Sequence, residues 1–278
     1  MYRDKLVIPD LTKKSCSVID GQHRLLGFEY ASRTDISLAC SIYDALPPSS
    51  QASLFSTINF NQRKVDKSLA YQLFGYSLEK TDRDSWSPDM LAVYFSRKFN
   101  VEEGNPFCNK IKYRVIGEDR NKQWSISSSP FVDGVLSLIT KAPKTDRYII
   151  NNSFLGGSLS RKRLNTETDN SPLRGFYIEG NDLAIEQILK EFFNRVNTIF
   201  WTKELVSKNI VLIKTVGISA LFDVLKNILQ KQTNINKNIY ADFDRVLTSV
   251  NPENFLDETA YPATTKGRGM IFKAFMNK

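Results

Sequence analysis

Residues 15–28, which read S-C-S-V-I-D-G-Q-H-R-L-L-G-F, are the stretch around which we interpret the fold. The β-branched pair Val18-Ile19 leads through Asp20-Gly21 into a helical pattern of apolar residues. This order predicts a short strand, a tight turn and the start of a helix. A helix start leaves backbone N–H groups unpaired and carries partial positive charge, so this turn is suited to an anion.

The side chains at this turn favour the same ligand. Gly21 lets the backbone approach a phosphate, and Gln22, His23 and Arg24 add hydrogen-bond donors beside it. His23 is the only histidine among 278 residues, so any imidazole chemistry must take place here. A purely structural interpretation is equally open from the residues alone: Asp20 caps the helix, and His23 and Arg24 form a solvated first turn.

Two motifs carry a resemblance to a known family. The string D-G-Q-H-R at residues 20–24 is the signature of the DGQHR-domain family, which includes DndB-type proteins of bacterial DNA phosphorothioation systems and is similar to the ParB/sulfiredoxin-like superfamily. Residues 55–65, F-S-T-I-N-F-N-Q-R-K-V, resemble that family's Phe-x-x-Ile-Asn-x-x-Gln-x-x-Val segment. The similarity covers roughly residues 5–80.

The resemblance implies an α/β (α+β) fold in two parts. Residues 1–84 are expected to form a small ParB/sulfiredoxin-like α/β core with strands at 5–9 and 36–43, lacking its usual first strand because the chain begins too close to it. Residues 85–278 are expected to form a larger, mainly helical domain with a basic loop at 156–175.

It also implies a nucleotide site at the turn, holding ATP or another nucleotide together with Mg²⁺. The residues expected to bind the phosphates are Gly21, Gln22, His23, Arg24, Asn59 and Gln62. From the residues alone, the carboxamides of Asn59 and Asn61 are equally suited to ending a helix.

The charge of the chain favours a polyanionic partner. The net charge is +8 and the isoelectric point is about 9.2, which favours DNA, although a basic solvated surface has the same composition. The cations that we expect to contact nucleic acid are Lys64, Arg161, Lys162, Arg163, Lys266 and Arg268. The basic loop is equally explained as a solvated, partly disordered segment, and residues 264–269 lack the P-loop spacing, which favours a flexible linker there.

The rest of the chain is predicted to be mostly helical. Apolar residues recur at helical spacing in segments that end in a C-terminal bundle, and the aromatic residues Phe192, Phe193, Phe200 and Trp201 are expected in its core. Residues 110–116 alternate like a strand, which we expect to pair with 123–126 as a hairpin. The predicted helices cover residues 22–32, 49–58, 65–78, 89–99, 130–140, 182–198, 211–230, 238–250 and 270–275.

The composition limits the cellular environment and the kinds of site that fit this chain. No run of about 18 apolar residues occurs, which predicts a cytoplasmic protein without a membrane partner. Cys16, Cys40 and Cys108 are odd in number and widely spaced, as expected of free thiols. One histidine and no cysteine pair argue against a zinc site, and no metal motif is visible; a Mg²⁺ held by carboxylates and a nucleotide phosphate stays open.

Three functions fit these observations. The first is a DNA-associated protein of the DGQHR type in a bacterial DNA-modification or defence system, with a regulatory or accessory role and with other proteins of its operon or a second copy as partners. The second is an enzyme, a ParB-like nuclease or NTPase, in which His23 is the base and Asp20 the nearest carboxylate. The third is a non-catalytic assembly component whose pocket is vestigial.

Overall fold

The computed structural model describes residues 17–31, 39–44, 46, 51, 54, 58, 71, 78, 81–112, 124–151, 160–232, 235 and 238–276. The chain divides into two compact units, Met1–Val65 and Asp66–Lys278. The boundary expected after residue 84 falls inside the second unit. Tyr71 packs against the core of that unit, where its hydroxyl donates to Asp133 Oδ1 at 2.5 Å.

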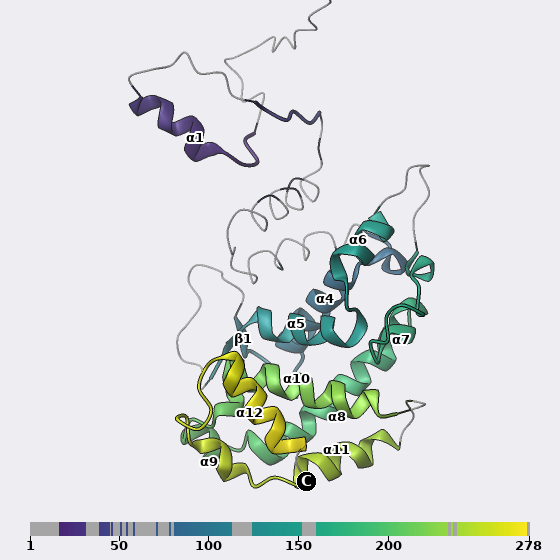
Figure 1. The fold of residues 1–278 in the computed structure, drawn as a ribbon, viewed down its shortest axis with the longest axis vertical. Helices are drawn as coiled ribbons and strands as arrows, with labels where there is room; N and C mark the ends of the chain where they lie inside the picture. The colour runs from purple at the N-terminus through teal and green to yellow at the C-terminus, as the bar shows by residue number, and fades with distance from the viewer. Residues whose placement is uncertain are drawn as a thin grey trace, which may run out of the picture. The chain divides into compact units, whose positions relative to one another are not determined.

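The second unit is built around the helix α10 (Thr215–Gln230). α10 packs between α5 (Ser128–Ile139) on one side and α12 (Thr265–Met276) on the other, and α4 (Pro88–Val101) covers the far side of α5 (Figure 1). α8 (Asp182–Phe200) pairs with α11 (Ile239–Thr248). The shorter helices are α6 (Pro143–Asn151), α7 (Arg174–Ile178) and α9 (Lys203–Ser207), and the 3-10 turns are η2 (Arg83–Ser85), η3 (Arg161–Arg163), η4 (Val211–Ile213) and η5 (Pro252–Leu256).

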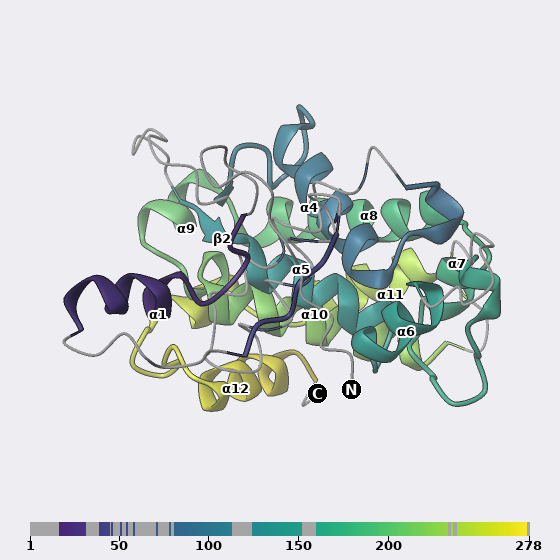
Figure 2. The same ribbon diagram turned by 90° about the horizontal axis from the view of Figure 1, so that it is seen from above.

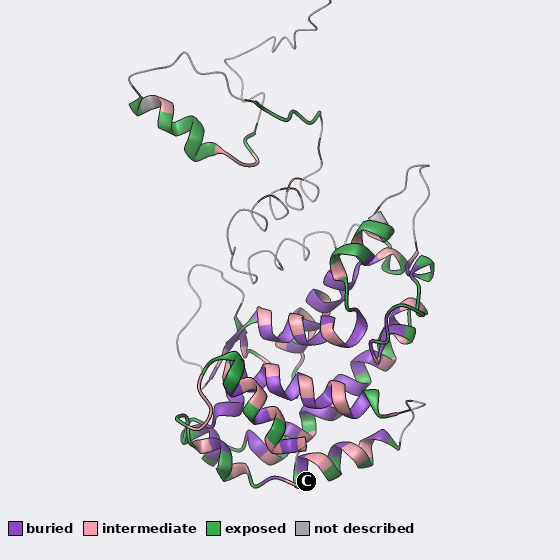
Figure 3. Ribbon diagram, in the orientation of Figure 1, coloured by how far each residue is buried: buried purple, intermediate pink, exposed green. Residues whose placement is uncertain are grey.

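The core of this unit is apolar and rich in aromatic rings. Buried residues predominate in α5 and α10, whose other positions are intermediate except at the two ends of α10, whereas α8 has a buried side and an exposed side (Figure 3). Phe193 lies near its centre, with ring centroids 4.9 Å from Phe107 and 5.0 Å from Phe222. The predicted core position of Phe192, Phe193, Phe200 and Trp201 is confirmed, because all four side chains are buried.

Helix boundaries follow local sequence signals. Ser87 precedes Pro88, and its side chain accepts from the Met90 N–H, so α4 begins with a capping serine and a proline at its first position. Thr202 caps α9 in the same way by accepting from Leu205. Most predicted helices of this unit are confirmed with ends shifted by a few residues; 211–230 instead divides into η4 and α10.

The predicted α/β fold of the N-terminal part is wrong. The described residues there form α1 (Gln22–Gly27) and the 3-10 turn η1 (Phe28–Tyr30), and Gln51, Leu54 and Ile58 are helical. Val18-Ile19 and residues 39–43, which we expected in strands, have no strand partner among the described residues. β-branched residues favour a strand only where a neighbouring strand supplies hydrogen bonds. The expected strand at 5–9 lies outside the described residues.

The hairpin predicted at 110–126 is also wrong. β1 (Ile111–Lys112) and β2 (Ile126–Ser127) pair in parallel, with Ile111 opposite Ile126, and form the only sheet among the described residues. Both isoleucines are buried beside α4 and α5, so burial of one apolar face sets the pairing. Alternation along a sequence predicts which face is buried but not the direction of the partner strand.

Across the described helices, none combines the length and the apolar character that crossing a membrane would need. Cys40 and Cys108 are not in a disulfide, and Cys16 lies outside the described residues.

Candidate functional site

The turn at residues 20–24 places a left-handed glycine directly before three consecutive polar side chains. Gly21 has φ 89° and ψ 8°, a left-handed conformation that glycine adopts without strain, and it is the N-cap residue of α1. The N–H groups of Arg24 and Leu25 donate to Gly21 O at 2.9 and 3.1 Å. The preceding N–H groups, those of Gln22 and His23, have no acceptor within the helix.

Every side chain that follows Gly21 in this turn is accessible. Gln22, His23 and Arg24 are exposed, and the Arg24 side chain retains 69% of its accessible surface. α1 has no buried residue, and even Leu25 and Leu26 are about half exposed. The three polar side chains are therefore open to a ligand from solvent.

Asp20 contacts Arg24 and does not cap the helix. The carboxylate oxygen Oδ2 lies 3.5 Å from Arg24 Nη2, and no side chain caps the N-terminus of α1. The interpretation of Asp20 as an N-cap is therefore wrong. This pair is long and exposed, so it orients the guanidinium without neutralising it.

The other residues expected at this turn lie outside the described part of the chain. They are Asn59, Gln62 and Lys64. In the residues that are described, no group of three or more His, Cys, Asp or Glu side chains is arranged to hold a metal ion.

The basic triplet at 161–163 is divided between the interior and the surface. Arg161 is 1% exposed, and its Nη1 lies 2.5 Å from Asp182 Oδ1 while its guanidinium stacks on Tyr177 at 4.9 Å. Lys162 and Arg163 are exposed. We predicted that Arg161 contacts nucleic acid, but it is part of the core. Its positive charge is compensated by the buried carboxylate of Asp182, 21 positions away.

Of the two C-terminal cations expected to contact nucleic acid, Lys266 and Arg268, one is exposed and the other forms an ion pair. Lys266 is exposed at the start of α12, whereas Arg268 makes a two-point ion pair with Asp223 of α10, at 2.5 and 2.6 Å. Residues 265–268 belong to α12 and not to a flexible linker. Arg268 thus holds α12 to α10, and of these two cations only Lys266 is left without an ion pair among the described residues.

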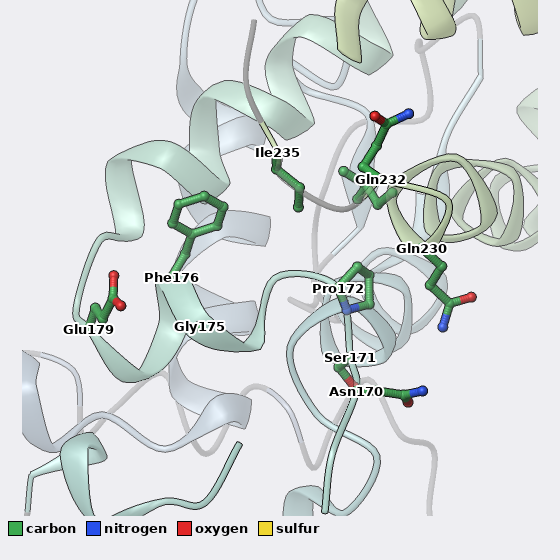
Figure 4. A pocket seen from close by; sticks show the side chains of 10 residues that line it. Asn170, Ser171, Pro172, Gly175, Phe176, Glu179, Gln230, Gln232 and Ile235 are labelled. Carbon is green, nitrogen blue, oxygen red and sulfur yellow. The ribbon is translucent and has the colours of Figure 1, made fainter. Parts of the chain in front are cut away.

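A cavity that no sequence motif indicated lies between α7 and the end of α10. It has a volume of about 650 Å³ and is lined by Asn170, Phe176, Glu179, Gln230 and Gln232, among others (Figure 4). Its described lining offers carboxamides, one aromatic ring and one carboxylate, and no cation, so it does not suit a phosphate. The residues come from two distant segments, which explains why no local pattern revealed it.

A second feature missed from the sequence is a group of buried acids beneath α6. Burial raises the pKa of Asp89 to about 6, although Arg147, 3.2 Å away, acts to lower it. Burial and the neighbouring Asp133 raise the pKa of Tyr71 well above its usual value. These groups connect the segment containing Tyr71 with α4, α5 and α6 through polar contacts.

Comparison of the chain with protein-family models, with curated proteins and with solved structures finds no match. The resemblance to the DGQHR family therefore rests on the two motifs at 20–24 and 55–65.

Proposed function

We propose that this chain is a cytoplasmic, DNA-associated protein of the DGQHR type, which binds DNA and a nucleoside triphosphate in a regulatory or accessory role in a bacterial DNA-modification or defence system. The observation that carries the proposal is the 20–24 turn. A left-handed Gly21 is followed directly by three exposed donor side chains, Gln22, His23 and Arg24. This arrangement suits a phosphate group.

Each part of the turn has a role in this proposal. The N–H groups of Gln22 and His23 donate to phosphate oxygens, and the Arg24 guanidinium supplies a charge-assisted bond. Asp20 positions Arg24 through the 3.5 Å contact. Mg²⁺ enters with the nucleotide, bound to its phosphates, as is usual for this ion.

The same turn is also compatible with catalysis, but its geometry favours binding. A hydrolase that uses His23 as a base needs a group that orients the imidazole. The carboxylate of Asp20 contacts Arg24, and no contact joins it to His23 among the described residues. We therefore propose a ligand-binding turn, with turnover as an outcome of the same experiment.

The test is binding of radiolabelled ATP with Mg²⁺, with and without duplex DNA, by the wild type and by Arg24→Ala. We expect Arg24→Ala to weaken nucleotide binding about tenfold or more, because a charge-assisted hydrogen bond contributes roughly 1.5–3 kcal/mol. Release of labelled phosphate is measured in the same samples. DNA-stimulated release would support an NTPase over a binding protein.

Arg245→Ala is the matched control. Arg245 is an exposed arginine, 75% accessible, with its own neighbouring partner Asp242 in α11, and the variant loses the same charge. It is expected to bind ATP like the wild type. Equal binding by wild type, Arg24→Ala and Arg245→Ala, or no binding by any of them, would contradict a nucleotide site at the turn.

A further inference from the structure

One end of the helical unit carries exposed cations without acidic partners. Lys141, Lys162 and Arg163, which we call the η3 basic surface, are exposed and form no ion pair with any described residue. Most other arginines of this unit are paired with an acid; Arg83, Arg147, Arg174 and Arg195 are examples. Exposed lysines without an ion partner also lie elsewhere on this unit, at Lys203, Lys266 and Lys273; at this surface two such cations are adjacent in one 3-10 turn.

The 3-10 turn η3 holds two of these cations in fixed positions. Arg161 is buried, where it contacts Asp182 and donates through Nη2 to Arg83 O at 2.5 Å. The Ser160 hydroxyl accepts from the Lys162 N–H at 3.3 Å, and the Arg163 N–H donates to Ser160 O at 3.1 Å. The first residue of the triplet thus fixes the turn, and the next two are left at the surface.

Lys141 belongs to the same framework. Its backbone N–H donates to Asp169 Oδ2 at 2.7 Å, and that carboxylate lies 3.3 Å from Arg174 Nη1. Arg174 in turn donates through Nε to Asn165 O at 2.8 Å, two residues after Arg163. α6 and α7 lie near each other at this end of the unit in both views, and η3 packs against them (Figures 1 and 2).

Three acids at this end are neutralised inside the protein. Asp146 and Asp169 are buried against Arg174, and Asp182 is buried against Arg161. Burial acts to raise the pKa of Asp169, but hydrogen bonds from Ser171 and Lys141 hold it below its usual value, so this acid is ionised and compensates Arg174. The exposed acids on the adjoining segments are Glu167, Glu179 and, beside Arg83 of η2, Asp82 and Asp84.

We infer that the η3 basic surface contacts the phosphate backbone of duplex DNA without reading its sequence. Several cations held on one rigid framework match a polymer of regularly spaced phosphates better than a single anion, and none of them is paired within the described chain. The inference rests on the proposed association with DNA, and it adds a contact surface to the one proposed at the 20–24 turn.

The test is the affinity of the full chain for a short DNA duplex, measured by fluorescence anisotropy at several salt concentrations. Lys162→Ala/Arg163→Ala is expected to weaken binding and to reduce the slope of log affinity against log salt by about 2, one for each phosphate that the variant no longer neutralises. Lys162→Arg/Arg163→Lys keeps both charges and should retain the wild-type slope.

Lys203→Ala/Lys273→Ala is the matched control, because it removes two exposed lysines from α9 and α12, which also form no ion pair with any described residue. It should leave the slope unchanged. If both double-alanine variants change the slope equally, net charge and not this surface governs binding, and the inference is overturned.

Two further outcomes separate this inference from the proposed function. If Lys162→Ala/Arg163→Ala binds DNA like the wild type while Arg24→Ala no longer binds ATP, the η3 basic surface is not a DNA contact and the nucleotide site stands. If the wild type binds ATP but no DNA at low salt, the inference and the DNA part of the proposed function both fail.

Discussion

Asp89 is the residue whose environment departs furthest from what its local sequence predicts. It occupies the first turn of α4, where an acid favours the helix start, yet its side chain is buried and 3.2 Å from Arg147. Because burial raises its folded pKa from 3.8 to about 6, ionisation of this group opposes folding. The unfolded chain releases this proton at a lower pH than the folded protein.

We therefore predict that Asp89 makes the protein less stable as the pH rises from 3.8 to about 6. Below this window the carboxyl group is protonated in both states, and within it the folded state holds the extra proton, so the contribution of Asp89 falls with rising pH. Asp89→Asn removes the titrating group. The difference in free energy of unfolding, variant minus wild type, should therefore increase across the window by up to about 3 kcal/mol.

Urea denaturation at a series of pH values measures this difference. Asp84→Asn, which removes a carboxylate at an exposed position of η2, is the control for the loss of one charge. A constant difference between Asp89→Asn and the wild type would show that Asp89 titrates as an exposed acid does.

Arg161 shows what the sequence could not predict at this scale. The run of three basic residues indicated a phosphate contact, and Lys162 and Arg163 remain candidates for one. The burial of Arg161 depends on Asp182 and on the carbonyl of Arg83, 78 positions away. No local pattern distinguishes one arginine of such a run from the next.

At the scale of elements, the packing of α5 on α10 depends on a glycine. A methyl group at Gly134 would lie 2.2 Å from the ring of Phe222, so a larger residue cannot be accommodated without moving α10 or the ring. Phe222 is itself buried and lies 5.0 Å from Phe193 in the aromatic core. α5 and α10 thus approach closely at this position.

We predict that Gly134→Ala lowers the free energy of unfolding by about 1–3 kcal/mol, the usual cost of overpacking, despite the higher helix propensity of alanine. Gly175→Ala in α7 is the matched control, because a methyl group there meets nothing within 4 Å. That variant should be equal to the wild type or more stable by about 0.4–1 kcal/mol. Thermal and urea denaturation of both variants provide the measurement, and an unchanged Gly134→Ala would contradict the close packing.

Helices were predictable from sequence where their apolar residues recur every three to four positions. α8 and α10 follow this rule. β1 lies within the strand predicted at 110–116, and β2 begins at the end of the partner predicted at 123–126, but their parallel pairing was not predicted, because it is set by the helices that cover them. Only the tertiary structure contains that information.

At the scale of the whole molecule, the candidate site and the core lie in different units of the chain. The 20–24 turn belongs to Met1–Val65, and the aromatic core belongs to Asp66–Lys278. The motif predicted a tight turn that leads into a helix, and in the structure a left-handed Gly21 precedes α1. The α/β core that the family resemblance implied around this turn is absent from the described residues.

The two proposals assign a phosphate ligand to the 20–24 turn in one unit and DNA to the η3 basic surface in the other. The turn offers backbone donors and one guanidinium to a single phosphate group, whereas the η3 basic surface suits a polymer. The two proposals are tested by different variants. A variant of the 20–24 turn leaves the η3 basic surface unchanged, and a variant of that surface leaves the turn unchanged, so each serves as a control for the other.

The most direct test of the central claim, a phosphate ligand at the 20–24 turn, uses the uniqueness of His23. Because it is the only histidine of the chain, its imidazole gives a single set of nuclear magnetic resonance signals. We predict that these signals shift saturably on titration with ATP and Mg²⁺, and that Arg24→Ala weakens or abolishes the shift while Arg245→Ala does not. Imidazole signals that stay unchanged while ATP binds elsewhere, or in the absence of any binding, would contradict the claim.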